Sequence, residues 1–311
     1  MRNVATAMSL PSAAPADMTV DERLNAFLQY RSLLLSIAYR MLGTFADAED
    51  MLQETFLRWQ QSSDVNVLSP KAFLVTVITR LCINHLQSAR VQREQYVGEW
   101  LPEPMVTLPG NDPSALPQVD ESLSLAFLML LERLTPMERA VFLLREVFDY
   151  DYSEVARIVG QNEANCRQIF RRSRLHIKEM RPRFDASLEL KEKLLREFLE
   201  ATSRGDMAGL LQIFSQDITV HTDGGGKASA LQNPVFGCKN SARVLISGNR
   251  KFRPQNSIIQ FVQVNGQPGL ASYLDGRVET IITVDVVNSQ IRNVYILRNP
   301  DKLQNTPSLP S

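Results

Sequence analysis

Apolar and polar residues alternate along this chain with two different periods. From about Asp21 to Arg93, and again from about Asp120 to Arg183, apolar residues recur at helical spacing. The first block predicts a bundle of about three helices, with these inward candidates: Leu33, Ile37, Leu42, Leu52, Phe56, Val77, Leu81 and Leu86. Between the blocks, GEWLPEPMVTLPGNDPSALPQ holds five prolines, which remove hydrogen-bond donors and disfavour helix before each ring. This stretch is predicted to be a linker.

The pattern changes after Pro182. A helix is expected from about Ser187 to Ser203, then a second helix, a strand and another helix near Ser241. The runs IIQFVQV, GLASYLD, VETIITVDVV and IRNVYILR follow as β-rich segments separated by the turn sequences NGQP, DG and NSQ. The last part of the chain is therefore predicted to be an α+β domain that ends in an antiparallel meander.

Composition narrows the class of protein. The 311 residues exceed one ordinary domain, and formal net charge is zero. Cys82, Cys166 and Cys238 show no metal-ligand or CxxC spacing, which favours buried thiols in a reducing, cytoplasmic compartment. The first 20 residues are expected to form a disordered leader rather than a signal peptide, and no run is apolar enough for a membrane span. We expect no metal and no cofactor.

The strongest local motif is YSEVARIVGQNEANCRQIFRRSRLHIKE. Ala156, Gly160, Cys166 and Ile169 have the spacing of a helix-turn-helix: a small residue at the crossing, a turn residue, and an apolar pair that locks the second helix. Between Ser153 and Arg183, eight basic residues stand against three acidic ones. The side chains expected to face DNA from this helix are Arg167, Gln168, Arg171, Arg172 and Arg174. The alternatives are an amphipathic helix with a solvated basic face and, for Cys166, a redox sensor.

LTPMERAVFLLREVFDYDYSEVARIVG and the basic helix resemble the fourth conserved region of sigma factors, which reads the minus-thirty-five promoter element. The chain has Gln161 and Asn162 where leucine and serine are common, although Asn162 can still cap the helix. AYRMLGTFADAEDMLQETFLRWQ resembles the second conserved region, with Leu52, Phe56 and Trp59 inside. The resemblance implies docking on the clamp helices of the largest RNA polymerase subunit, through Asp47, Glu49, Asp50, Gln53 and Glu54. A favourable interaction of these acids with the helix dipole is the simpler alternative.

SPKAFLVTVITRLCINHLQSARVQRE resembles the part of that region that melts and reads the minus-ten element. Exposed Thr76, Arg80, Asn84, Arg90 and Arg93 are expected to contact DNA, and Phe73 is either an aromatic platform for a base or part of the core. The linker can reach about 80 Å at roughly 3.3 Å per residue, while two turns of duplex span about 70 Å. One chain can therefore hold both promoter elements.

The α+β part resembles the SnoaL-like or NTF2-like cone fold that extends one subgroup of extracytoplasmic-function sigma factors. Three stretches carry this likeness: WLPEP, DGGGK and NPDKL. The resemblance implies regulation in cis through contacts between the cone and the linker. The residues assigned to this role are Trp100, Leu101, Pro102, Asp223, Gly224, Gly225, Gly226, Lys227, Asn299, Pro300, Asp301 and Lys302. The expected domains are a leader (1–20), region 2 (21–94), a linker (95–119), region 4 (120–183) and the SnoaL-like domain (187–311).

The fold class is thus multidomain: two all-α domains followed by an α+β cone, in a sigma factor that is not an enzyme. Its expected partners are core RNA polymerase and promoter DNA, with a small ligand in the cone left open and no membrane. One rival is a cyclase or isomerase that uses His221 and Asp223 as acid and base. Another is a one-component repressor that senses a ligand. DGGGK lacks the full spacing of a phosphate loop.

Overall fold

A computed structural model describes residues 18–62, 69–93, 96–108, 123–180 and 186–308. The expected leader lies almost wholly outside these residues. The described chain forms two compact units. Unit 1 comprises residues 18–62, 69–90 and 131–179, and unit 2 comprises 91–93, 96–108, 123–130, 180 and 186–308.

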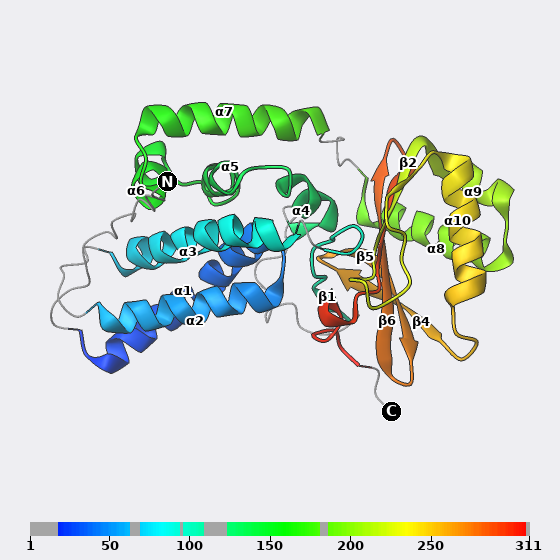
Figure 1. Ribbon diagram of the computed structural model, residues 1–311, viewed down its shortest axis with the longest axis horizontal. Coiled ribbons are helices and arrows are strands. Elements are labelled where there is room, and N and C mark those ends of the chain that lie inside the picture. Colours follow the sequence, from blue (N-terminus) through cyan, green and yellow to red (C-terminus); the bar gives the residue numbers. More distant parts are fainter. Residues whose placement is uncertain (1–17, 63–68, 94–95, 109–122, 181–185, 309–311) are drawn as a thin grey trace. The chain divides into compact units, whose positions relative to one another are not determined.

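The first half of unit 1 has the expected three helices, α1 (Val20–Leu42), α2 (Phe45–Gln61) and α3 (Pro70–Arg93) (Figure 1). A capping box between Thr19 and Glu22 starts α1, and Gly43, in the left-handed conformation, ends it. The core contains Trp59, whose indole Nε1 donates to the Arg23 carbonyl at 2.9 Å. Of the predicted inward residues, six are buried, whereas Leu33 and Phe56 are only partly so.

The second half of unit 1 contains α5 (Pro136–Phe142), the π-helix η3 (Leu143–Val147), α6 (Tyr152–Val159) and α7 (Glu163–Met180). Gly160 ends α6 at φ +70°, and the Asn162 side chain caps α7 by accepting from the Asn165 amide at 2.8 Å. Cys166 and Ile169 are buried, as expected for the apolar pair that locks the second helix. Burial raises the pKa of the Cys166 thiol, which argues against a reactive redox sensor.

Unit 2 is built on one sheet with the strand order β1-β4-β5-β6-β7-β2-β3. The helices α8 (Leu188–Arg204) and α9 (Met207–Ile213) come first, and α10 (Cys238–Phe252) follows β2 (Phe214–Asp223) and the short β3 (Val235–Phe236). The predicted meander is β4 (Ile258–Val264), β5 (Gln267–Leu274), β6 (Arg277–Val287) and β7 (Gln290–Leu297). Its turns have positive φ at Asn265, Asp275 and Asn288, and asparagine and aspartate tolerate this left-handed conformation better than most residues. The meander returns so that β7 lies parallel to β2.

The two faces of this sheet are covered differently. Helices α8 to α10 pack on one face around Phe198, Leu245 and Val220. The other face is covered by the chain before the sheet: β1 (Val106–Thr107) pairs with β4, and Leu101 and Leu125 join a second core. Leu125 begins α4 (Leu125–Leu131). Part of the predicted linker is therefore built into the α+β unit.

Candidate functional site

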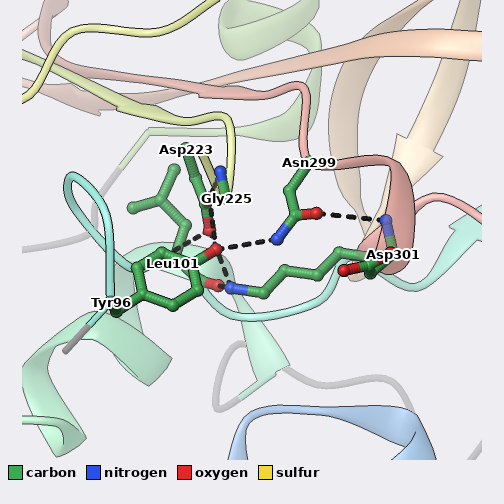
Figure 2. Close-up of polar contacts among 7 residues, drawn as sticks. Tyr96, Leu101, Asp223, Gly225, Asn299 and Asp301 are labelled. Atoms are coloured by element: carbon green, nitrogen blue, oxygen red, sulfur yellow. Dashed lines mark hydrogen bonds and ion pairs between the residues drawn. The ribbon is translucent and has the colours of Figure 1, made fainter. Parts of the chain in front are cut away.

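The carboxylate of Asp223 lies at the centre of a buried network that joins the linker to the ends of β2 and β7 (Figure 2). Its Oδ1 accepts from the Tyr96 hydroxyl at 2.6 Å and from the Gly225 amide at 3.0 Å. Its Oδ2 accepts from the Leu101 amide at 2.9 Å and from Lys302 Nζ at 2.7 Å. Asp223 is 0% exposed, so four donors replace the water that a carboxylate would otherwise bind. We call the contacts that residues 96–105 of the linker make with the α+β domain the linker clasp.

Lys302 closes the clasp from η4 (Pro300–Lys302). Its buried ammonium group also donates to the Leu101 carbonyl and lies 4.2 Å from the centre of the Trp100 ring. Leu101 therefore gives its amide to Asp223 and its carbonyl to Lys302. Removing one member of a buried ion pair leaves an uncompensated charge, so each partner holds the other in place.

Asn299 joins the clasp through the Tyr96 hydroxyl. The Asn299 Nδ2 donates to the Tyr96 hydroxyl at 2.7 Å, while its Oδ1 accepts from the Asp301 amide and starts η4. Desolvation, together with the hydrogen bond to Asp223, raises the pKa of Tyr96 well above its usual value. Tyr96 therefore stays a neutral donor to the carboxylate at physiological pH.

The glycines of DGGGK permit close backbone approach. Gly225 has φ +59°, and a Cβ there would lie 2.3 Å from Asn299 Nδ2. A Cβ at Gly224 would lie 2.2 Å from the Ala228 carbonyl oxygen, and one at Gly226 would lie 3.1 Å from Val97. At the exposed rim, Lys227 pairs with Asp301 at 2.6 Å.

Three further clasp contacts involve residues that sequence reasoning did not assign to it. Asn265 exchanges two hydrogen bonds with Met105, Met105 N to Asn265 Oδ1 at 3.0 Å and Asn265 N to Met105 O at 2.7 Å. In the sequence, Asn265 is marked only as the first residue of the turn sequence NGQP. Glu99 lies 2.8 Å from Nδ1 of His221, whose ring stacks on Tyr295. Of the regulatory residues expected from sequence, these six meet at the clasp: Trp100, Leu101, Asp223, Gly225, Asn299 and Lys302. Pro102 is buried and Pro300 is exposed.

The expected DNA-facing residues of α7 are all exposed. Arg172 lies 2.8 Å from Glu138, and Arg167 pairs with Glu163 and lies over the Tyr152 ring at 4.3 Å. Gln168, Arg171 and Arg174 share this exposed surface. The helix thus presents a continuous polar and basic face.

The expectations for α3 need correction. Arg80 is 8% exposed rather than on the surface, because its guanidinium donates to the carbonyls of Ile158 at 2.8 Å and Arg157 at 2.9 Å, at the end of α6. Burial lowers its pKa. Thr76 is also buried and donates to Ala72, while Phe73 packs on Trp59 and belongs to the core. Asn84 is exposed; the side chains of Arg90 and Arg93 lie outside the described residues.

The acidic residues of α2 lie along its first turns. Asp50 and Gln53 are exposed, while Asp47 is 3.6 Å from His85 and Glu49 is 3.6 Å from Arg31. Glu54 pairs with Arg58 at 2.7 Å. A groove lined by Leu52, Gln53, Phe56 and Leu57 adjoins them, so this surface combines acids with apolar side chains.

The described residues also bear on two other kinds of site. None of the helices in those residues is long and apolar enough to cross a bilayer. Nor do those residues gather three or more histidine, cysteine, aspartate or glutamate side chains suited to a metal ion.

Two family models match the chain: Sigma-70 region 2 over residues 26–91 and Sigma-70, region 4 over residues 124–177. The chain is 32% identical over 292 residues to the ECF RNA polymerase sigma factor SigJ of Mycobacterium tuberculosis, an alignment that covers 90% of this chain and 93% of SigJ. It is 28% identical over 280 residues to the probable ECF RNA polymerase sigma factor SigI of the same species, covering 89% and 93%.

The crystal structure of M. tuberculosis SigJ superposes with a TM-score of 0.74 at 30% identity, over 91% of this chain and 99% of that one. The predicted fold class, two helical sigma regions followed by an NTF2-like α+β domain, is confirmed. A sigma factor works with RNA polymerase on promoter DNA, and both partners follow from the two matched regions. The chain belongs to the extracytoplasmic-function RNA polymerase sigma factors.

Proposed function

We propose that the α+β unit of this sigma factor regulates promoter-directed transcription in cis by holding the linker between regions 2 and 4. The observation that carries the proposal is the buried pair of Asp223 and Lys302, which binds both the amide and the carbonyl of Leu101. The contact is tethered, so the linker meets the cone at a high effective concentration.

Linker length gives the clasp a means of acting on transcription. Residues 96–107, when extended, would supply about 40 Å of the linker's reach at roughly 3.3 Å per residue. While the cone holds these residues, their length cannot contribute to the distance that the linker spans between regions 2 and 4. Closing or opening the clasp therefore changes how far apart the two promoter-reading regions can stand.

The test is transcription from a cognate promoter by purified core polymerase and each sigma variant. Tyr96→Phe removes one hydroxyl from the linker side and leaves the cone residues unchanged. We expect it, and a deletion of residues 299–311, to change promoter-dependent output in the same direction and non-additively, because both open one interface. Lys193→Met, an exposed position on α8, is the matched control. Unchanged output for both clasp variants would show that the cone does not regulate the sigma factor.

We further propose that Arg167, Gln168, Arg171, Arg172 and Arg174 contact the minus-thirty-five element, with Asn84 at the minus-ten element. Arg171→Ala is expected to weaken promoter binding by about 1–3 kcal/mol if it grips a base edge. A phosphate contact would instead weaken binding to every sequence and reduce the salt slope by about one. Equal affinity and an unchanged slope would contradict this orientation of α7.

For polymerase, we propose that Asp47, Glu49, Asp50, Gln53 and Glu54 dock on the clamp helices of the largest subunit. Replacing exposed Asp50 by lysine should reduce association with core polymerase without lowering the melting temperature. The same kind of charge reversal in unit 2, Glu279→Lys in β6, is a charge-matched control. Normal core binding by the Asp50 variant would exclude this surface. We also propose that the protein acts in the cytoplasm, because its expected partner, core RNA polymerase, works there.

We propose that the cone is not an enzyme. His221 is engaged by Glu99 of the linker, and both oxygens of Asp223 accept hydrogen bonds from the clasp. The pair offered as acid and base is thus occupied in binding the protein's own chain.

A further inference from the structure

A pocket of about 450 Å³ lies in unit 2 between the sheet and the helices α8 and α10, on the face opposite the clasp. Its walls are mainly apolar and include Phe198, Leu245, Leu270, Ile282 and Ile296. This volume falls within the range of small-molecule sites in proteins, which are concave and mostly apolar with a few polar groups.

The charges that line the pocket are all of one sign. Lys251, Arg253 and Arg298 contribute to the lining, which contains no aspartate, glutamate, histidine, cysteine or tyrosine. Arg298 donates to the Ser229 carbonyl at 2.8 Å and lies 5.6 Å from the Phe252 ring. Arg253 reaches Ser203 and Ser257. Within the described chain, none of the three cations lies within 4.0 Å of a carboxylate, so their charge is not balanced by an ion pair.

This combination selects a class of ligand. An apolar body gains free energy by leaving water for the walls. A carboxylate at its end would balance the cations and accept charge-assisted hydrogen bonds from the arginines. A cationic ligand would meet repulsion, and the lining offers no carboxylate, imidazole, thiol or phenol for acid–base catalysis.

Residues of the pocket alternate with residues of the clasp along two adjacent strands. Thr222 lines the pocket and the next residue is Asp223; Ile296 and Arg298 line it, and Leu297 and Asn299 belong to the linker face. The backbone amides of Arg298 and Asn299 both donate to the Asp223 carbonyl, at 2.7 and 3.0 Å. A displacement of Arg298 would therefore be transmitted directly to two clasp residues.

We propose that the cone pocket binds an amphipathic carboxylate, and that its occupancy changes the stability of the linker clasp. The coupling depends on a ligand that binds the closed and open clasp with different affinity. The binding site itself does not depend on the proposed regulation of transcription; only the consequence for transcription does.

Isothermal titration of the full chain with decanoate, decanol and decylammonium tests the ligand class. Decanoate should bind at least about tenfold more tightly than decanol, and decylammonium should bind most weakly. Arg298→Gln should reduce the affinity for decanoate about tenfold and leave decanol unchanged, whereas Arg243→Gln, on the exposed side of α10, should change neither. Equal affinities for decanoate and decanol would overturn the anionic class. Absence of binding by all three probes would overturn the site.

A separate experiment tests the coupling. If bound decanoate changes the free energy of closing the clasp, then closing the clasp must change the binding free energy of decanoate by the same amount. Tyr96→Phe, which weakens the clasp without touching the pocket, should shift the dissociation constant for decanoate severalfold. An unchanged constant would overturn the coupling while the site remained. Transcription that fails to respond to Tyr96→Phe, combined with a shifted constant, would instead reject only the regulatory function.

Discussion

The two faces of the sheet in unit 2 are covered differently although they are made by the same strands. One face is filled by the protein's own linker, with Leu101 fully buried and each oxygen of Asp223 occupied. The other retains a pocket of about 450 Å³ with three cations in its lining. Successive side chains of a strand point to opposite faces, so adjacent residues such as Thr222 and Asp223 serve different surfaces. One strand end can thus hold a tethered segment on one side and remain open to a diffusible molecule on the other.

The largest effect is expected on the linker face, from Lys302→Met. It leaves the Asp223 carboxylate buried without its cation, which should lower the free energy of unfolding of unit 2 by about 3–5 kcal/mol. Urea unfolding measures this loss. Asp223→Asn in the same chain should restore part of it, and Lys193→Met should change stability by less than about 0.5 kcal/mol. A small effect of Lys302→Met would mean that the pair is not buried in solution.

Leu101→Ala tests whether the linker is part of the core of unit 2. Removing a fully buried leucine leaves a cavity and typically costs about 2–5 kcal/mol. Leu175→Ala, at an exposed leucine of α7, is the matched control and should cost far less. If the two substitutions had equal effects on urea unfolding, the linker would not be packed against the sheet.

Tyr96→Phe removes the hydroxyl that joins Asp223 to Asn299 and leaves the ring in place. Hydrogen bonds to charged groups contribute about 1.5–3 kcal/mol, so a loss of about that size is expected. Because the folded-state pKa of Tyr96 is raised, its stabilising contribution is present at neutral pH and is lost as pH rises above the unfolded value of about 10. Wild type should therefore lose stability relative to Tyr96→Phe above that pH. Parallel pH curves for the two proteins would contradict the buried hydroxyl.

The smallest effect is expected on the pocket face, from Thr280→Leu. Thr280 lines the pocket, so a larger side chain has room, and stability should change by less than about 1 kcal/mol. Ala271→Leu provides the contrast, because Ala271 is fully buried in the core on the linker face and overpacking there costs about 1–3 kcal/mol. Thermal melts of the two variants would sharpen the comparison. Equal losses would mean that the pocket is as tightly packed as the linker face.

Local patterns predicted most of the helices and strands of this protein, although β1 lies in the stretch expected to be a linker. The helical period marks α1 to α3 and α5 to α7, the spacing of Ala156, Gly160 and Cys166 indicates the helix-turn-helix, and the positive φ at Asn265 fits its turn. These features depend on neighbours close in sequence, so periodicity and turn chemistry are sufficient. The close approach around DGGGK also follows from the absence of Cβ atoms there.

Tertiary structure alone decided which polar side chains are buried and what they bind. Arg80 is a residue type that commonly contacts DNA, yet its guanidinium binds backbone carbonyls of α6. Tyr96 and Asn265 join the clasp although no sequence motif marks them. A polar side chain is buried only where partners from distant segments satisfy it, and the pairing of Asp223 with Leu101 and Lys302 spans residues far apart in the chain. Such partners are brought together by the packing of whole elements, which no local pattern encodes.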